Sequence, residues 1–342
     1  MFIVIGRVVR CRWAQAATAA ALAGAAALAG AVPAAASPMH LVDCNVNHNA
    51  LQPAIAGAAE GETLPVTGTC TGPFTISNDL TLDGIGRAVL DGSQAGRTVT
   101  VGSGAVVSLN YLIITNGVGG INNQGTLTVR NSTVSGNTAS NGPGGGINNA
   151  VGAILVVNVS TVKDNYALGA GGGINNNGSL TVHDSHLFGN SADNCGGIDS
   201  VGIGITATVG QSSVHGNIAR VADGGGICDG QGGSLTLSGS LVYSNTAGFG
   251  AGLYDNDGTA SVVRSTVERN TASAQGGGVF NVNGGTMTLT RSAVTGNTAD
   301  GGPGSGGGVY NAGGTLTLDR SGVRQNKPDN CTPPGSVPGC FG

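Results

Sequence analysis

The amino-acid sequence predicts an all-β fold, a parallel β-helix whose coils each contribute three short strands. A Gly-Gly-aliphatic motif recurs eight times at intervals of 24 to 30 residues, and a fixed period of this length indicates stacked supersecondary units. Apolar and polar residues alternate within each unit, as at Leu180 and Val182, which is typical of strands. Aromatic residues make up only 4% of the chain, as expected for a narrow core of aliphatic side chains.

Two positions define the repeat. The aliphatic residue that ends each glycine run falls at Ile121, Ile147, Ile174, Ile198, Ile227, Leu253, Val279 and Val309. An asparagine closes each unit, at Asn137, Asn165, Asn190, Asn217, Asn245, Asn270, Asn297 and Asn326. Because Gly and Asn favour turns, they separate the strands of one coil.

The pattern Gly-Gly-Gly-Ile-x-Asn followed by Leu-Thr-Val-x-x-Ser-x-Val-x-x-Asn covers roughly residues 64–330. It resembles the right-handed parallel β-helix repeat of the pectin-lyase-like superfamily, and its Gly-Gly-[Ile/Val] and closing-Asn elements are similar to polymorphic outer membrane protein repeats. The resemblance implies a right-handed helix. It implies no single function, because this architecture carries lyases, hydrolases, adhesins and inert spacers.

The first segment, residues 1–36, has the composition of a secretory signal peptide. Three arginines at its start precede an apolar run from Ala14 to Val32, and Ala34–Ala36 supply small residues for cleavage. This order of charged, apolar and small residues is typical of exported proteins. We therefore expect a secreted, extracellular protein.

An N-terminal cap is expected over residues 37–63. Asn49 is a suitable N-cap for a short helix that places Leu51, Ile55 and Ala58 on one face. Such a helix would cover the open end of the first coil and hide a sheet edge. The β-helix itself is expected over 64–326, with shorter coils up to Asn116 and about ten to eleven coils in all.

The remaining residues, 327–342, are expected to form a tail pinned by a disulfide. Removal of Cys11 with the signal leaves six cysteines, an even number that favours disulfides in an oxidising compartment. Fifteen connectivities are possible, and the positions suggest the pairs Cys44–Cys70, Cys195–Cys228 and Cys331–Cys340.

The charge of the chain argues against two classes of partner. Without the three arginines of the signal, 11 Lys and Arg face 18 Asp and Glu, a formal charge of −7. Such a chain has no basic stripe for nucleic acid or anionic lipid. We expect a monomer that contacts neither nucleic acid nor, after signal cleavage, a membrane.

A polar row is expected on the outside of the coils, two residues after each Gly-Gly-aliphatic motif. Its members are Asn123, Asn149, Asn176, Ser200, Asp229, Asp255, Asn281 and Asn311. Stacked amides can bond from coil to coil. Asp229 and Asp255 interrupt them on consecutive rungs, and like charges so close repel unless a proton or cation intervenes or both point to water.

Three interpretations of this acidic pair stay open. Asp199, one coil earlier, adds a third carboxylate, and calcium prefers such oxygen ligands. Asp229 and Asp255 could instead catalyse glycoside hydrolysis, or calcium could assist a lyase with Arg220 as the nearby base. In the third interpretation, Asp replaces Asn in solvent-facing turns.

Aromatic residues occupy the neighbouring outward position late in the chain, at Tyr254, Phe280 and Tyr310, with Phe249 close by. An exposed aromatic strip marks a contact surface, and sugar rings stack on such strips. Alternatively, these rings only stack on one another, or glycine-rich loops around 301–307 cover them.

Hydroxyl residues form ranks on the outward face of the Leu-Thr-Leu strands. The pairs are Thr126/Thr128, Ser179/Thr181, Thr206/Thr208, Ser234/Thr236, Thr259/Ser261, Thr286/Thr288 and Thr315/Thr317. These ranks resemble the surface of β-helical ice-binding proteins, but Thr is also a favoured polar strand residue.

These features together predict a non-catalytic, adhesin-like protein that binds a polysaccharide or a cell-surface glycan. A calcium-assisted polysaccharide lyase or glycoside hydrolase is the second hypothesis. Ice binding is the third.

Overall fold

The computed structural model describes residues 41–221 and 223–341, which belong to one compact unit, Met39–Gly342. The expected signal peptide, residues 1–36, and the start of the expected cap lie outside the described residues. None of the described residues forms a helix that is long and apolar enough to cross a lipid bilayer.

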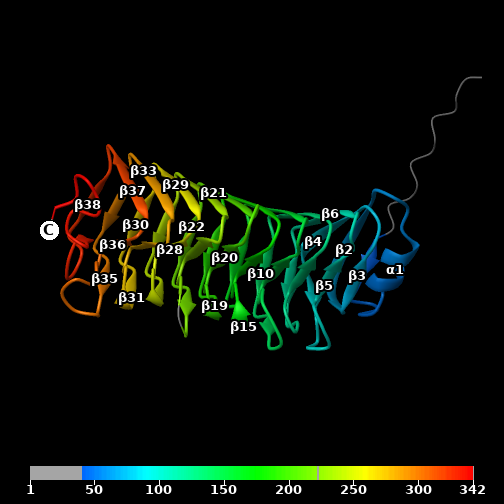
Figure 1. Ribbon diagram of the computed structural model, residues 1–342. Coiled ribbons are helices and arrows are strands. Elements are labelled where there is room, and N and C mark those ends of the chain that lie inside the picture. The colour runs from blue at the N-terminus through cyan, green and yellow to red at the C-terminus, as the bar shows by residue number, and fades with distance from the viewer. Residues whose placement is uncertain (1–40, 222, 342) are drawn as a thin grey trace, which may run out of the picture. The chain divides into compact units, whose positions relative to one another are not determined.

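Three parallel sheets run along the stack of coils in this unit (Figure 1). Sheet A has 21 strands: β1 (Val42–Asp43), β2 (Glu62–Thr71), β4 (Leu80–Asp91), β6 (Val106–Asn110), β7 (Ile113–Thr115), β9 (Thr126–Arg130), β10 (Thr133–Ser135), β13 (Ile154–Asn158), β14 (Thr161–Lys163), β17 (Ser179–His183), β18 (His186–Phe188), β21 (Thr206–Gly210), β22 (Ser213–His215), β25 (Ser234–Ser238), β26 (Leu241–Tyr243), β29 (Thr259–Val263), β30 (Thr266–Glu268), β33 (Thr286–Thr290), β34 (Ala293–Thr295), β37 (Thr315–Asp319) and β38 (Gly322–Arg324).

Sheets B and C complete the coils. Sheet B has 11 strands: β3 (Phe74–Ile76), β5 (Val99–Val101), β8 (Ile121–Asn123), β12 (Ile147–Asn149), β16 (Ile174–Asn176), β20 (Ile198–Val201), β24 (Ile227–Gly230), β28 (Leu253–Asn256), β32 (Val279–Val282), β36 (Val309–Ala312) and β39 (Cys331–Thr332). Sheet C has 7 strands: β11 (Thr138–Ala139), β15 (Tyr166–Ala170), β19 (Ser191–Asn194), β23 (Ile218–Ala219), β27 (Thr246–Phe249), β31 (Thr271–Gln275) and β35 (Thr298–Ala299).

The predicted parallel β-helix is confirmed, and the 11 strands of sheet B agree with the expected ten to eleven coils. Equivalent residues pair from coil to coil, so that Leu127, Leu155 and Leu180 lie in one row. Each full coil contributes to three sheets, as predicted. Sheet A receives two successive strands from a coil, which are joined by a bend such as that at Asn131 between β9 and β10.

The interior is an aliphatic column flanked by buried polar rows. The closing asparagines point inward, and all but Asn326 are at most 1% exposed. The backbone N–H and Nδ2 of Asn217 both donate to Oδ1 of Asn245 at 3.0 Å, and the same Nδ2 donates to the carbonyl of Leu187. This pattern repeats along the stack, so each asparagine satisfies the polar groups of a buried bend.

The glycine runs allow the coils to approach closely. A Cβ on Gly173 would lie 2.6 Å from the carbonyl oxygen of Gly197 and 3.1 Å from Nδ2 of Asn190. A larger residue there would displace backbone of the next coil. The Gly-Gly sequence is therefore a packing requirement as well as a turn signal.

Both ends of the described unit are closed. Helix α1 (Leu51–Gly57) buries Leu51 and Ile55 at one end (Figure 1). Its N-cap is Ala50 without a side-chain cap, so the expectation that Asn49 caps it was wrong. At the other end, β39 in the tail pairs with β36, so the tail adds a strand to sheet B as well as a loop.

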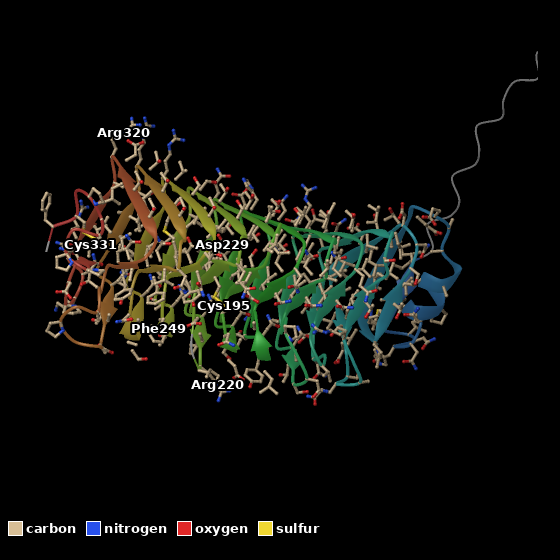
Figure 2. All side chains as sticks on the ribbon, in the orientation of Figure 1. Cys195, Arg220, Asp229, Phe249, Arg320 and Cys331 are labelled. Atoms are coloured by element: carbon tan, nitrogen blue, oxygen red, sulfur yellow. A yellow bond between two sulfur atoms is a disulfide. The ribbon has the colours of Figure 1, made fainter. Side chains whose placement is uncertain are left out.

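Three disulfides join Cys44 to Cys70, Cys195 to Cys228 and Cys331 to Cys340. These are the pairs that the cysteine positions suggested. Two of them lie near the ends of the stack and one lies in its middle. Figure 2 shows Cys195 and Cys331 in these places.

Candidate functional site

The candidate site lies on the outer face of sheet B. Strand pairing places one outward residue of each coil in a single row, which runs Asp199, Cys228, Tyr254, Phe280 and Tyr310. Successive side chains of a strand point to opposite faces, so the next residue of each strand points into the coil. The row contains all three aromatic residues that the sequence nominated for ligand binding.

The three rings form a stack. The centroids of Tyr254 and Phe280 lie 5.5 Å apart with planes 7° from parallel, and those of Phe280 and Tyr310 lie 5.1 Å apart at 12°. These centroid distances exceed the separation of about 3.5 to 4 Å expected for rings stacked directly face to face. The rings are therefore in offset parallel stacking, and each ring covers only part of its neighbour's face.

Phe280 is less exposed than the sequence suggested. The Phe249 ring lies 5.3 Å from it at an angle of 56°, and only 9% of Phe280 is accessible. Tyr254 and Tyr310 are half-buried. The accessible aromatic surface therefore belongs mainly to the two tyrosines, with Phe280 fixing their positions.

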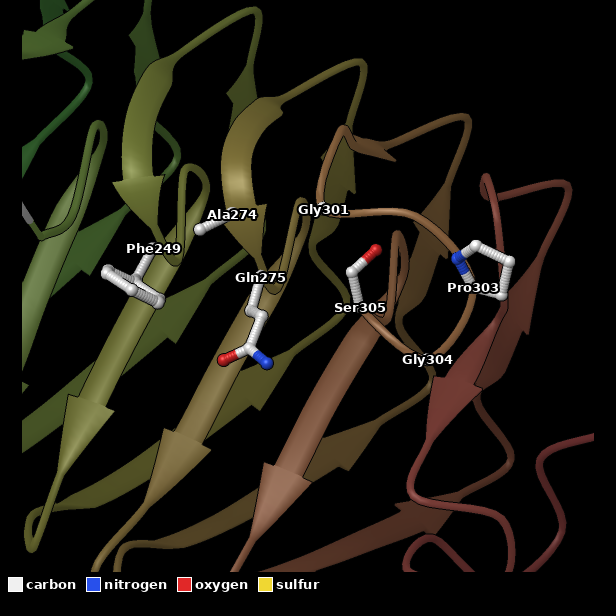
Figure 3. A pocket seen from close by; sticks show the side chains of 7 residues that line it. All are labelled: Phe249, Ala274, Gln275, Gly301, Pro303, Gly304 and Ser305. Carbon is white, nitrogen blue, oxygen red and sulfur yellow. The ribbon is translucent and has the colours of Figure 1, made fainter.

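A second row of residues forms the opposite wall of a groove. Each residue that precedes a glycine run accepts a backbone hydrogen bond from the run one coil earlier, as Phe249 does from Gly224 and Gln275 from Gly250. This row places Asn194, Asp223, Phe249, Gln275 and Ser305 beside the aromatic row. In Figure 3, Phe249, Gln275 and Ser305 follow one another on successive coils, and the loop around Pro303 curves beyond them.

The groove consists of two hollows that share Asp223 and Tyr254. The acidic hollow, of about 360 Å³, is lined by residues that include Asn194, Asp199 and Gln231. The aromatic hollow, of about 380 Å³, is lined by residues that include Phe249, Phe280 and Tyr310. The shared residues make the two hollows one continuous surface.

Two carboxyl groups in the acidic hollow hold protons more tightly than usual. Burial raises the pKa of Asp199 to about 7, although part of the side chain reaches the surface. Burial also raises the pKa of Asp223, and a hydrogen bond from Tyr254 opposes this rise. Carboxyls with such shifts are candidates for proton transfer or for hydrogen bonding to a ligand.

A chain of polar groups fixes Tyr254. Nδ2 of Asn283 donates to Oδ1 of Asn256 at 2.8 Å, and Nδ2 of Asn256 donates to the Tyr254 hydroxyl at 3.3 Å. Burial, and then the negative charge of Asp223, raise the pKa of this hydroxyl to about 12. Tyr254 therefore remains a neutral hydrogen-bond donor at physiological pH.

The Cys195–Cys228 disulfide lies beside Asp199. A sulfur of each cysteine and a carboxylate oxygen of Asp199 lie within 4.8 Å of one another. Both sulfurs belong to the disulfide, so they do not act as thiolate metal ligands. The bond ties the end of β19 to β24 under the acidic hollow.

The structure separates the three carboxylates that the sequence grouped as a calcium site. Asp229 and Asp255 do lie opposite one another on β24 and β28. Their side chains point into the coil and are each 1% exposed, so the expected outward position of the polar row was wrong. Asp199 belongs to the outer row, and the strands separate it from the other two. The three residues do not form one calcium-binding cluster.

The proposed base is also distant. The guanidinium of Arg220 lies over the Tyr166 ring, 5.5 Å from its centroid. Figure 2 shows Arg220 at the rim of the stack, away from Asp229. Asp229 contributes to the floor of the acidic hollow, but it and Asp255 are each only 1% exposed, and Arg220 lines neither hollow.

Sequence analysis missed the wall that contains Asp223. The sequence did contain a signal for this wall. Asp223, Phe249 and Gln275 each directly precede a glycine run, and Asn194 is separated from its run only by Cys195. The length of the preceding loop varies among the repeats, however, so alternation alone could not place this row. Only the hydrogen bonds of the glycine runs bring it beside the aromatic row.

A second aromatic stack lies on the outer face of sheet A. His215 stacks between Phe188 and Tyr243, with centroids 5.0 and 4.5 Å apart. Lys163 lies over Phe188 and Arg269 lies over Tyr243. Since cations cover the two ends, this stack offers less free ring surface than the row on sheet B.

The hydroxyl ranks also lie on sheet A. Thr206 and Thr208 of β21 are exposed, and Thr206 donates to Ser179 of the preceding coil at 3.3 Å. Ile154 and Val156 interrupt the ranks at β13. The ranks therefore point outward as expected, with contacts between hydroxyls of neighbouring strands.

Comparison with known proteins supports the architecture. No family model matches the chain, and no curated protein sequence matches it. Among solved structures, the crystal structure of pectate lyase Pel9A superposes with a TM-score of 0.53. The superposition covers 83% of this chain and 78% of that one at 16% sequence identity. The chain has a pectin-lyase-like β-helix fold. At this identity the similarity concerns the fold alone, so function must be argued from the groove.

Proposed function

We propose that this protein binds an extracellular polysaccharide in the groove on sheet B. The supporting observation is the continuous surface that joins the Tyr254–Phe280–Tyr310 row to Asp199 and Asp223. Partly uncovered rings suit the apolar faces of sugars, and the carboxyl and amide groups can hydrogen-bond to hydroxyls. The groove extends from β20 to β36, which is about 20 Å at the usual strand spacing.

The lining favours a neutral polysaccharide. Asp199 and Asp223 contribute acidic groups, and Asn194, Gln231 and Asn256 contribute amides, whereas neither hollow is lined by Arg or Lys. An anionic chain would meet carboxylates without a compensating cation. A chain that carries only hydroxyl groups avoids this repulsion.

The test is binding of the purified protein to immobilised neutral and acidic polysaccharides. Tyr254→Ala and Tyr310→Ala should each weaken binding about 3- to 10-fold, because an aromatic contact contributes about 0.5 to 1.5 kcal/mol. Tyr243→Ala, which changes a tyrosine in the other stack, is the matched control and should bind as wild type. Equal losses in all three variants, or retention of acidic polymers only, would contradict this proposal.

A second candidate is hydrolysis of the bound chain. The observation that favours it is the pair Asp199 and Asp223, whose raised pKa values suit a general acid. Release of reducing ends that is lost in Asp199→Asn and in Asp223→Asn would support it. Asp229→Asn and Asp255→Asn should keep that activity, because these residues are buried. Adding a chelator tests the calcium-assisted lyase that the sequence suggested.

The proposed setting is outside the cytoplasm. Three disulfides within a single chain indicate folding in an oxidising compartment. Export through residues 1–36 is part of this proposal. Amino-terminal sequencing of the secreted protein would test it, with cleavage expected after Ala36.

A further inference from the structure

The inner row of sheet B is a directional chain of hydrogen bonds. Nδ2 of Asn123 donates to Oδ1 of Asn149 at 2.8 Å, and Nδ2 of Asn149 donates to Oδ1 of Asn176 at 2.8 Å. Nδ2 of Asn176 then donates to Oγ of Ser200 at 3.0 Å. Asn149 and Asn176 thus each accept from the preceding coil and donate to the following one.

The same direction resumes near the other end. Nδ2 of Asn281 donates to Oδ1 of Asn311 at 2.8 Å, and Nδ2 of Asn311 donates to the carbonyl of Ser336 at 2.8 Å. Between Ser200 and Asn281, the two intervening rungs are Asp229 and Asp255, which pair in register with the amide rungs. The carboxyls thus occupy amide positions.

The interruption leaves four buried side-chain oxygen atoms without a well-formed hydrogen bond, although backbone N–H groups of Gly230 and Thr259 lie near Asp229. They are both carboxyl oxygens of Asp229, Oδ2 of Asp255 and Oδ1 of Asn281. The other oxygen of Asp255, Oδ1, accepts from the backbone N–H of Gly258 at 2.8 Å. All three side chains are at most 1% exposed, so bulk water does not satisfy them.

We propose that Asp229 and Asp255 are both neutral carboxylic acids in the folded protein, and that their protons complete the chain. Asp229 donates to Asp255, and Asp255 donates to Oδ1 of Asn281. These two protons give a partner to one oxygen of Asp229, to Oδ2 of Asp255 and to Oδ1 of Asn281, and the other oxygen of Asp229 lies near backbone N–H groups that include that of Gly230. A carboxylic acid has nearly the shape of a carboxamide, so the coil spacing is unchanged.

A calcium ion accounts for these atoms less well. Calcium takes six to eight oxygen ligands, and the unpartnered side-chain oxygens number four. Glycine backbone also packs directly against the carboxyls. A Cβ on Gly258 would lie 2.7 Å from Oδ1 of Asp255 and 2.8 Å from Oδ2 of Asp229. A proton needs no additional space, whereas a hydrated ion does.

The electrostatic surroundings agree with the neutral form. Burial first and Asp255 second raise the pKa of Asp229 to about 7, against nearby backbone N–H groups that lower it. Burial first raises the pKa of Asp255 to about 6, with Asp257 adding to the rise. The facing strands β25 and β29 contribute uncharged residues such as Leu235 and Ala260, and the remaining acidic neighbour, Asp199, lies on the groove side of β20.

The consequence is a pH-sensitive segment beneath the groove. An aspartate in an unfolded chain has a pKa near 3.9, so the folded state binds these two protons more tightly. Their stabilisation is complete below about pH 4 and is lost as the pH rises through about 6 to 7. The strands that carry Asp229 and Asp255, β24 and β28, also carry Cys228 and Tyr254 on their outer face, which belongs to the groove.

The experiment compares urea denaturation of wild type and the double variant Asp229→Asn/Asp255→Asn at pH 5 and pH 8. Asparagine donates at both pH values. The advantage of the variant over wild type should therefore be small at pH 5 and clearly larger at pH 8, seen as a wider gap between the two urea midpoints. Asp300→Asn, at an exposed aspartate, is the control and should show no such pH-dependent gain. The measurement is of stability, so its outcome is independent of polysaccharide binding.

Two results would overturn the proposal. One is a difference between variant and wild type that is equal at both pH values. The other is a calcium-dependent rise of the wild-type midpoint at pH 8 that the double variant lacks, which would indicate a cation site. If the double variant does not fold, the carboxyl carbon-13 NMR signals of wild type decide. The carboxyl signals of Asp229 and Asp255 are expected to change chemical shift between pH 5 and pH 8 as the two groups ionise. Chemical shifts typical of ionised carboxylates at pH 5 would overturn the proposal.

Discussion

The rings of Tyr254 and Phe280 stack with centroids 5.5 Å apart and planes 7° from parallel. Strand register alone produces this relationship, since the two residues are direct partners on β28 and β32. Phe280 also contacts Phe249 across the groove and Tyr310 on the following coil. It therefore connects both walls of the groove.

Phe280→Ala should reduce both stability and binding. Removal of a buried phenylalanine side chain typically costs about 3 to 5 kcal/mol, so we expect a loss of about 3 kcal/mol in the free energy of unfolding. Polysaccharide affinity should fall because Tyr254 and Tyr310 lose their support. Phe188→Ala, in the half-buried stack on sheet A, should cost less stability and leave binding intact. Denaturation and binding measured on both variants check this.

The asparagine row makes a second prediction. Asn217→Ala removes the acceptor for the N–H of Asn190 and the donors to Asn245 and Leu187. Each buried polar group left without a partner costs about 1 to 3 kcal/mol, so the free energy of unfolding should fall by about 3 kcal/mol or more. Asn141→Ala, at an exposed loop position, should change it little. A small loss at Asn217 would show that water replaces these bonds.

The repeat made the fold predictable. Rows such as Leu127, Leu155 and Leu180 follow from alternation within a unit and from the constant spacing between units. Inward and outward positions were harder to assign in the segment after each glycine run, because both positions are polar there, as in Asn148 and Asn149. The burial of Asp229 therefore emerged only from the structure.

The groove was predictable in part for a related reason. Tyr254, Phe280 and Tyr310 share one position of the repeat, so their stacking followed from the sequence. Asp223 follows a loop of irregular length, and its approach to Tyr254 depends on how that loop folds. Periodicity specifies the neighbours of residues inside the repeat and does not specify where insertions lie.

The disulfides should differ in their contribution to stability. In the chain-entropy description, the stabilisation grows with the length of the closed loop. The Cys195–Cys228 bond spans 33 residues and the Cys331–Cys340 bond spans 9. Replacing each pair by serine should therefore cost about 4 and about 2.5 kcal/mol, respectively. Thermal or urea unfolding checks the order, and a greater loss for the shorter loop would contradict it.

Loss of the Cys195–Cys228 bond should also affect the groove. The bond fixes β24 beside Asp199, so binding should weaken in the serine pair at this site more than in the pair at Cys331 and Cys340. Binding is measured well below the unfolding midpoint of each variant, which separates a local effect from unfolding. Equal binding by both variants would show that the disulfide acts on stability alone.

Asp199 gives the last prediction. Because burial raises its pKa to about 7, the protonated form stabilises the folded state below about pH 4, and this contribution is lost as the pH rises through 7. Asp199→Asn keeps a neutral side chain at every pH, so it should gain stability relative to its parent between pH 5 and pH 8. The comparison is made in the Asp229→Asn/Asp255→Asn background, where the inner carboxyls no longer titrate. Since Asp199 lies on the other face of the strands, the two effects should add. No pH-dependent gain in that background would mean that solvent reaches the Asp199 carboxyl in the folded protein and keeps its pKa near the ordinary value.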